Sequence, residues 1–188
     1  MEKADIIRSD RRTISIEITN DLRLIVRAPL RMSNADIEKF ICEKTPWIEK
    51  HIEIVKSRNR TYAENAKPFS KDDLTALRKQ ALIAIPPKVE ALAHIIGVSY
   101  KKITIRNQLT RWGSCSSNGN LSFNCLLMLC PDEVVDYVII HELCHRKHMN
   151  HSKAFWATVK KYCPEYKKQQ LWLKTNGNEL IYRLRTIT

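Results

Sequence analysis

The sequence predicts an α+β fold, in which a small N-terminal β-α module precedes a larger unit that combines helices with a small antiparallel sheet. Short stretches with apolar residues at every second position are typical of strands, and longer stretches with a spacing of three or four are typical of helices. Hydrophobic residues make up 44% of the 188 residues, which is enough for a packed core and argues against disorder. We expect the module and a linker over 1–69 and the main domain over 70–188.

The module begins with a predicted β-hairpin. Isoleucines alternate with polar residues over 14–18, and leucine and valine alternate with polar residues over 22–26. Alternation of this kind is typical of half-buried strands. Asn20-Asp21 lies between the two stretches and favours a turn, and Pro29 ends the second strand.

Two helices follow within the module. Ser33 or Asn34 is the expected N-cap of a short helix. Pro46 falls in the first turn of a second helix, whose apolar stripe ends at Val55. Residues 56–69 are polar, and we interpret them as the linker.

The main unit opens with a helix for which Ser70 is the expected N-cap. We expect Pro86-Pro87 to interrupt it, because proline removes a backbone hydrogen bond and clashes with the preceding turn. The second proline can open a further helical segment, which ends near Gly97.

A small sheet is predicted next. Apolar alternation over 103–105 indicates one strand, and the segments 111–117 and 120–123 indicate a hairpin on either side of Asn118-Gly119. This dipeptide favours positive φ at both turn positions, so we expect a tight two-residue turn.

The rest of the chain is predicted to be helical. Pro131 opens an apolar helix that leads into a histidine-rich run. Ser152 is the expected cap of the following helix, and Pro164 ends that helix or starts another. A last helix runs toward Asn176-Gly177.

The histidine-rich run carries the strongest indication of chemistry. Residues 141 to 151 read His-Glu-Leu-Cys-His-Arg-Lys-His-Met-Asn-His. On a helix, His141 and His145 lie one turn apart and direct two imidazoles at one point, as zinc ligands do. Glu142 is then close enough to act as general base on a water at that metal. Similar ligand sets also accept other divalent metals.

Two imidazoles hold a metal poorly, so a third ligand is expected from His151 or His148. We favour His151, because a ligand placed after the helix breaks leaves one coordination position open, as in catalytic zinc sites. His148 is then a cation at the helix end or a hydrogen-bond partner of a ligand. Cys144 points about 100° away from His145 around the helix, and we interpret it as buried packing.

Charge and cysteine usage restrict the partners and the compartment. The net charge is +12 and the isoelectric point is near 9.5, which favours nucleic acid, nucleotides or acidic polypeptides as partners. The basic residues are spread along the chain, so the charge alone selects none of them. The six cysteines form no Cys-x-x-Cys pair, so we expect reduced thiols and no zinc ribbon.

Membrane and export segments are not expected. No stretch approaches the apolar length of a membrane span, and the charged start of the chain lacks the apolar core of a signal peptide. We therefore expect a cytoplasmic protein, and the sequence does not indicate its oligomeric state.

The run from His141 to His145, followed by Asn150-His151-Ser152 and Phe155-Trp156, resembles the YgjP-like metal-dependent hydrolases, which are relatives of the SprT-like zinc peptidases. Further segments of the chain match that family as well: Arg8-Ser9-Asp10-Arg11-Arg12-Thr13, Pro46-Trp47-Ile48, Arg111-Trp112-Gly113-Ser114-Cys115-Ser116 and Asn118-Gly119-Asn120-Leu121. The resemblance covers nearly the whole chain.

The resemblance implies a zincin-like catalytic domain with an active-site helix and a compact sheet. It also implies that His141, His145 and His151 are the metal ligands and that Glu142 is the base. The substrate class stays open, because the family is identified as metallopeptidase by analogy.

The predicted hairpin supplies the candidate substrate contacts, which are Arg111, Gly113 and Ser114. A strand at the sheet edge beside the metal helix can pair with an extended peptide. Arg111 can hold a carboxylate or phosphate, or stabilise an oxyanion, and Gly113 permits a close backbone approach. We interpret Trp112 as part of the core.

Three functions are compatible with these features. The first is a cytosolic zinc metallopeptidase that cleaves peptide bonds with a metal-activated water. The second is a metal-dependent phosphohydrolase that acts on nucleotides or polyphosphates, and the third is a nucleic-acid-associated protein with a structural zinc site.

Overall fold

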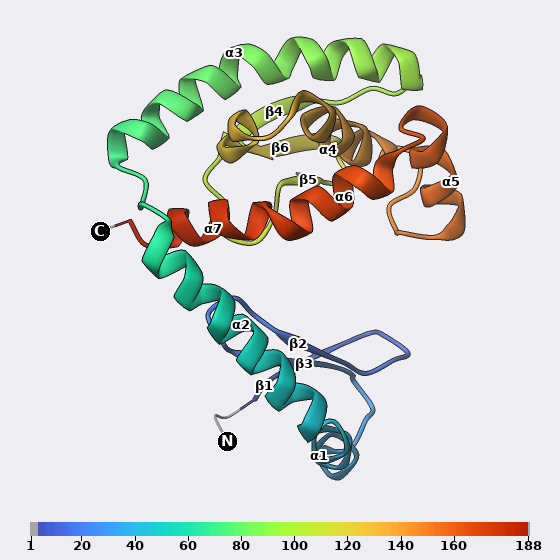
Figure 1. Ribbon diagram of the computed structural model, residues 1–188. Helices are drawn as coiled ribbons and strands as arrows, with labels where there is room; N and C mark the ends of the chain where they lie inside the picture. The colour runs from blue at the N-terminus through green and yellow to red at the C-terminus, as the bar shows by residue number, and fades with distance from the viewer. Residues whose placement is uncertain (1–3, 188) are drawn as a thin grey trace. The chain divides into compact units, whose positions relative to one another are not determined.

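The computed structural model describes residues 4–187, so the first three residues of the charged start and residue 188 lie outside it (Figure 1). The chain forms two compact units, Met1–Ala66 and Lys67–Thr188. Helices and small sheets occur in both units, which confirms the α+β class. None of the described helices combines the length and the apolar character needed to cross a bilayer.

The first unit contains the predicted hairpin, and one further strand joins it. β2 (Ser15–Ile18) pairs antiparallel with β3 (Leu24–Pro29). β1 (Asp5–Ser9) pairs parallel with β3 on its other side. The sequence analysis missed β1 because Ile6 and Ile7 are adjacent and both exposed, so this strand lacks the apolar alternation of its neighbours.

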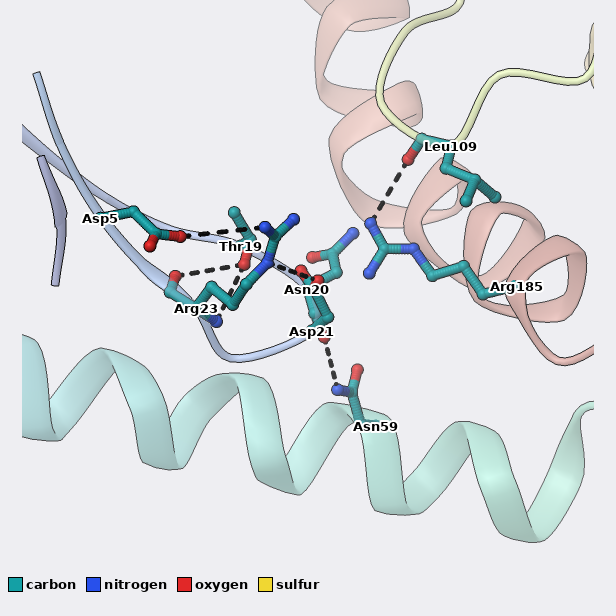
Figure 2. Close-up of polar contacts among 8 residues, drawn as sticks. All are labelled: Asp5, Thr19, Asn20, Asp21, Arg23, Asn59, Leu109 and Arg185. Atoms are coloured by element: carbon teal, nitrogen blue, oxygen red, sulfur yellow. Dashed lines mark hydrogen bonds and ion pairs between the residues drawn. The ribbon is translucent and has the colours of Figure 1, made fainter. Parts of the chain in front are cut away.

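Polar contacts hold the hairpin turn, as Figure 2 shows. The Thr19 hydroxyl donates to the Arg23 carbonyl at 3.1 Å and accepts from the Arg23 backbone N–H at 3.0 Å, and the Arg23 guanidinium donates to Asp21 at 2.9 Å. The Asn59 side chain donates to the Asn20 carbonyl at 2.8 Å. Leu22 within this turn has a φ of 65°.

Asn59 belongs to a helix that the sequence analysis ended too early. α1 (Asn34–Glu43) is capped by Ser33, and α2 (Thr45–Asn65) has proline in its first turn, as predicted. The prediction of a linker over 56–69 is wrong over 56–65, because α2 continues to Asn65. Polar residues in this part of α2, Arg58 and Asn59, donate hydrogen bonds to Asn20, so the polar stretch is a helix face that contacts the hairpin turn.

The second unit begins with α3 (Lys71–Ile96), which Ser70 caps in a reciprocal pair with Asp73. Gly97 ends the helix with a φ of 71°, as predicted. The predicted interruption at Pro86-Pro87 is wrong, because the helix continues through both prolines.

Burial along α3 explains why the helix tolerates them. One face is buried both before and after the prolines, with buried residues four positions apart: Leu77, Ala81, Ile85, Val89 and Ala93. A proline inside a helix costs roughly 3 kcal/mol, whereas each fully buried aliphatic side chain contributes about 1.5–3 kcal/mol. Packing of the continuous face therefore outweighs the local preference to break.

The second sheet has the order β4-β6-β5 and is mixed, where the sequence analysis predicted an antiparallel sheet. β4 (Lys102–Arg106) pairs parallel with β6 (Asn120–Asn124), and β5 (Gly113–Cys115) pairs antiparallel with β6. The loop 107–112 carries the chain past β6, so that β5 forms the opposite edge and β6 returns between the two earlier strands.

The turn between β5 and β6 differs from the predicted one. Gly119 has a φ of 81°, but Asn118 does not have a positive φ. The Gly119 N–H donates to the Ser116 carbonyl at 2.8 Å, and the Ser116 N–H donates to the Asn120 carbonyl at 3.0 Å. This pattern is typical of a three-residue loop that places glycine in the left-handed region after an ordinary turn, so only Gly119 needs positive φ.

Helices complete the second unit. A 3₁₀ segment that the sequence analysis did not predict, Cys125–Leu129, leads into α4 (Asp132–Cys144). Three helices follow: α5 (Lys153–Tyr162), α6 (Tyr166–Thr175) and α7 (Gly177–Arg185). The last of them was missed. Figure 1 shows α4 beside the sheet, between α3 and the pair α6 and α7.

Candidate metal centre

α4 is buried along nearly its whole length, which places its last turn inside the unit. Its residues 134–144 are buried except for Asp136 and His141, which are partly exposed. The helix ends at Cys144, and His145 is its C-cap residue with helical φ and ψ. His141 and His145 therefore lie one above the other at the point where the chain leaves the helix.

The structure brings three of the predicted side chains together. The ligand nitrogens of His141, His145 and His151 all lie within 4.8 Å of one another. The Nε2 atoms of His141 and His151 are 3.0 Å apart, close to the separation of about 3.3 Å between two nitrogens on a tetrahedral zinc. Among the described residues, this is the group of histidine, cysteine and carboxylate side chains whose geometry suits a metal. The donor set therefore fits a divalent cation.

One buried aromatic ring supports all three imidazoles. The ring centroid of Phe155, which is fully buried, lies 4.9 Å from that of His141, 4.6 Å from that of His145 and 4.8 Å from that of His151. Trp156 stacks on His151 at 5.7 Å, and Tyr166 stacks on Trp156 at 5.3 Å. The start of α5 thus fixes the orientation of the histidine that comes from outside α4.

A backbone carbonyl orients one of the histidines. Nδ1 of His145 lies 3.0 Å from the carbonyl oxygen of His148, which places the proton on Nδ1 and leaves Nε2 free as a ligand. The ring of His148 is not part of the converging group. His148 therefore contacts a predicted ligand through its backbone carbonyl, whereas the sequence analysis considered only roles for its side chain.

Burial favours the neutral form of His141 and His145, which is the form that binds metals. It lowers the pKa of His141 to about 3, with the neighbouring charges of His145 and His151 acting in the same direction. Burial also lowers the pKa of His145. Nδ1 of His141 is buried without a hydrogen-bond partner among the described residues.

Glu142 is buried beside this group, with 6% of its surface exposed. Burial raises its pKa to about 8, and the positive charge of Arg111 opposes that rise. A β-carbon placed on Gly113 would lie 2.7 Å from Cγ of Glu142 and 2.8 Å from its Oε1. β5 can approach the carboxyl group this closely only because residue 113 is glycine.

Two cavities adjoin Glu142, and His141, Arg111 and Gly113 also line both. One has a volume of about 260 Å³ and is mostly apolar, with these further lining residues: Thr110, Trp112, Tyr137, Val138 and Leu173. The other has a volume of about 300 Å³ and is completed by Ser114, Cys115, His145, Met149 and His151. Together they form the space in which a substrate can meet the metal.

The candidate substrate residues all line these cavities. Arg111 is exposed, and Gly113 and Ser114 are partly buried on the edge strand β5. Trp112 packs against the core, as predicted, but it also lines the apolar cavity. Cys144 is fully buried, and burial raises the pKa of its thiol to about 11, so it packs as a neutral group and does not compete as a ligand.

Two positioning residues were missed by the sequence analysis. The Arg146 guanidinium donates to the Ser99 carbonyl at 3.0 Å and to the Ser117 carbonyl at 2.8 Å, so it ties the β5–β6 turn to the end of α4. The fully buried Asn124 donates to the carbonyls of Gln108 and Arg111 at 2.6 and 3.0 Å. Arg146 is adjacent to a predicted ligand, which is an indication that sequence alone provides, whereas Asn124 stands out only once its burial is known.

Comparison with known proteins identifies the family of this chain. A family model described as YgjP-like, metallopeptidase domain, matches residues 12–74 and 71–176. Two solved structures are similar, each with 23% sequence identity: the metallopeptidase zymogen abylysin of Pyrococcus abyssi and the metallopeptidase zymogen jannalysin of Methanocaldococcus jannaschii. Abylysin has a TM-score of 0.42 over 49% of this chain and 95% of its own. Jannalysin has a TM-score of 0.41 over 46% of this chain and 93% of its own. No curated protein matches the chain.

Proposed function

This chain belongs to the YgjP-like metallopeptidase family, and from that premise we propose that it is a zinc-dependent peptidase with His141, His145 and His151 as ligands and Glu142 as general base. The observation that supports this proposal best is the convergence of three ligand nitrogens within 4.8 Å next to a buried carboxyl group. A metal site built only for structure has four protein ligands, whereas three leave a position for water or substrate.

Zinc is the metal that this donor set suits best. Imidazole nitrogens are ligands for zinc, and tetrahedral geometry with three of them is typical of catalytic zinc sites. When bound, zinc lowers the pKa of a water ligand and polarises the carbonyl of the bond to be cleaved. Other divalent metals of the same series remain competitors that metal analysis distinguishes.

Glu142 moves the proton. Its carboxylate accepts the proton of the attacking water and passes it to the leaving amine. Burial raises the pKa of Glu142 to about 8, and a divalent cation on the neighbouring imidazoles favours the ionised form. The two effects oppose each other, and we expect them to bring the pKa of Glu142 close to pH 7. A general base works best when its pKa lies near the operating pH.

β5 is the element that we expect to hold the substrate. It lies at the edge of the sheet, so its outer backbone groups are available to an extended peptide. Arg111 lies just before the strand and Ser114 lies within it, and both line the cavity that contains the three histidines. We infer that Arg111 binds a substrate oxygen, because a guanidinium offers several donors in a fixed plane.

The state of the cysteines supports a cytoplasmic location. All six are free thiols among the described residues, and a reducing compartment keeps thiols in this form.

Metal analysis and two classes of variant test the proposal. Purified protein is expected to hold about one zinc per chain, and His141→Ala and His151→Ala are expected to lose it, whereas His148→Ala keeps it because its ring is outside the group. Glu142→Gln is expected to keep zinc and to lose at least about a hundredfold in peptide cleavage, since general base catalysis contributes about 10²–10⁴.

Gly113→Ala sharpens the same test. The added methyl group must displace the Glu142 side chain, so cleavage is expected to fall while zinc stays bound. Full peptide cleavage by Glu142→Gln contradicts the mechanism. So does retention of zinc by both single variants, His141→Ala and His151→Ala.

A further inference from the structure

A third cavity, with a volume of about 500 Å³, lies on the face of the β4-β6-β5 sheet that points away from the core. Residues alternate between the two faces of a strand. In β4, Ile103 and Ile105 pack on the core, and Lys102, Thr104 and Arg106 line the cavity. We call this cavity the outer pocket, and polar residues dominate its lining: Lys102, Thr104, Arg106, Gln108, Arg111, Ser114, Cys115, Ser116, Asn120, Leu121 and Ser122.

The charge of the outer pocket is one-sided. Lys102, Arg106 and Arg111 contribute three positive charges, and its lining contains no carboxylate. Neither Lys102 nor Arg106 forms an ion pair with a carboxylate within the described part of the chain. Positive charges that converge in a concave polar site favour an anionic ligand.

A buried hydroxyl group gives independent evidence for a ligand. Ser122 lies in the middle strand with only 9% of its surface exposed, and its Oγ has no hydrogen-bond partner among the described residues. Buried polar groups in proteins are nearly always satisfied, so an orphan in a cavity marks a position where a partner binds. The buried amide oxygen of Gln108 in the same pocket is also unpaired, and turning that amide over presents its NH₂ group to an anion.

The outer pocket is continuous with the metal centre. Arg111, Ser114 and Cys115 line the outer pocket and also the cavity that contains the three histidines. The two spaces are separated only by the edge strand β5. A substrate that lies along β5 therefore has both within reach.

We propose that the outer pocket binds a carboxylate of the peptide substrate while the bond to be cleaved lies at the three histidines. This inference rests on the proposed peptidase function. A peptide that pairs with β5 extends the sheet by one strand, so its side chains alternate between the α4 side and the outer side. Every second side chain of the substrate then faces the mostly apolar cavity beside Glu142, and the side chains between them face Arg111 and the outer pocket.

Strand spacing favours a long acidic side chain. Neighbouring strands lie about 4.8 Å apart, so an added strand lies about 10 Å from β6 and about 14 Å from β4. Lys102 and Arg106 reach inward from β4 with long side chains, and the substrate must reach toward them across β5. Glutamate is therefore expected to be preferred over aspartate.

Matched peptides test this inference with the zinc-loaded full chain. Peptides that differ only in having glutamate, aspartate or glutamine at one position are compared, and the position is scanned across the cleaved bond. We expect kcat/KM to be about tenfold higher for glutamate than for glutamine, and the double variant K102Q/R106Q to lose most of that ratio while still cleaving the glutamine peptide. Lys101→Gln removes the neighbouring charge outside the pocket and is expected to keep the full ratio.

A binding measurement separates the pocket from the chemistry. Zinc-loaded Glu142→Gln is titrated calorimetrically with the same peptides, with their C-terminal amides and with inorganic phosphate. If amidation of the C-terminus weakens binding of every peptide equally, the carboxylate in the pocket is the terminal one; if replacing glutamate by glutamine weakens binding, the carboxylate is the glutamate's. Either result supports the proposal.

Two outcomes contradict the proposal, and a third contradicts the peptidase function on which it rests. Equal cleavage of all peptides, their C-terminal amides included, overturns the pocket and leaves the peptidase intact. If phosphate binds tightly in a way that depends on Lys102 and Arg106 while no peptide is preferred, that result assigns the pocket to a phosphate group and overturns the proposal that it binds a carboxylate. Selective binding of the glutamate peptide without cleavage by the zinc-loaded wild type overturns the peptidase mechanism and not the binding site.

Discussion

The two faces of the β4-β6-β5 sheet are built from the same strands, but the ionisable groups beside the core face are mostly buried, whereas those of the outer face are exposed. On the core side, Glu142 and the histidines of α4 are packed against glycine and aromatic rings, and burial shifts their pKa values. On the outer side, Lys102 and Arg106 are exposed, and no described carboxylate in the lining neutralises them.

The residues proposed for catalysis therefore lie on one face of the sheet, and those proposed for substrate recognition lie on the other. Groups that change protonation or bind a metal work better in a rigid site of low dielectric constant, because charges interact more strongly there. Groups that only attract a charged part of a substrate can stay solvated. Because side chains alternate along a strand, the short strand β5 borders both settings at once.

The core side depends on packing, so the largest expected effect is that of Phe155→Ala. This ring is fully buried and lies under all three imidazoles. Its removal is expected to lower the free energy of unfolding by about 3–5 kcal/mol, as measured by urea denaturation. Zinc affinity, measured by competition with a coloured chelator, is expected to fall about 10–100-fold.

Val159→Ala is the matched control. Val159 is equally buried one turn along α5, but it has no aromatic ring that could support the imidazoles. This substitution is expected to lower stability without changing zinc affinity. Unchanged zinc affinity in Phe155→Ala would show that the histidines hold their positions without the ring beneath them.

A smaller effect, of a few kcal/mol, is expected from the ionisation of Glu142 in metal-free protein. Burial raises its pKa from 4.5 to about 8 in the folded chain, so between these values the unfolded chain releases a proton that the folded chain keeps. Stability should therefore fall as the pH rises through this window, by about 1.4 kcal/mol per pH unit at most, and level off above pH 8.

Glu142→Gln removes this dependence and leaves every other titrating group in place. With chelator present, the variant is expected to match the wild type near pH 4.5 and to be more stable at pH 8. Glu133→Gln, an exposed position at the start of the same helix, serves as the control and should follow the wild type. Parallel curves for wild type and Glu142→Gln would mean that the carboxyl group is not desolvated.

The smallest effect sharpens the account of the outer face, because it compares two buried polar residues that lie on this face of β6, one with hydrogen-bond partners and one without a partner among the described residues. Asn124→Ala leaves the carbonyls of Gln108 and Arg111 without their donor, and we expect a loss of about 1–3 kcal/mol in unfolding free energy. Ser122→Ala removes a buried hydroxyl without a partner, so stability is expected to stay within about 1 kcal/mol and to rise slightly. Equal losses in the two variants would contradict the assignment of Ser122 to a ligand.

Local patterns in the sequence sufficed for much of this architecture. The hairpin of the first unit, the caps Ser33, Ser70 and Ser152 and the end of α3 at Gly97 were all predicted. Each depends on a residue and its immediate neighbours, which is the range over which capping and alternation act. For the candidate site, the spacing of histidines indicated which residues converge, since helix periodicity alone relates His141 to His145.

The features that were missed depend on contacts between distant segments. α3 continues through Pro86-Pro87 because its buried face packs on both sides of the prolines, and no local pattern contains that information. Asn124 and Ser122 lie two residues apart on one strand, yet the Asn124 side chain is saturated with hydrogen bonds, whereas the Ser122 hydroxyl has no partner within the described part of the chain. Only the fold distinguishes them.

The stacking of Trp156 on His151 has a practical consequence. An indole whose face lies 5.7 Å from the centroid of a ligand ring experiences any cation that this ring takes up. If His151 binds a metal as proposed, we expect the emission of Trp156 to change with occupancy of the centre, most strongly for metals with unfilled d shells, which quench nearby fluorophores. Trp156 would then report metal loading in real time without an attached dye.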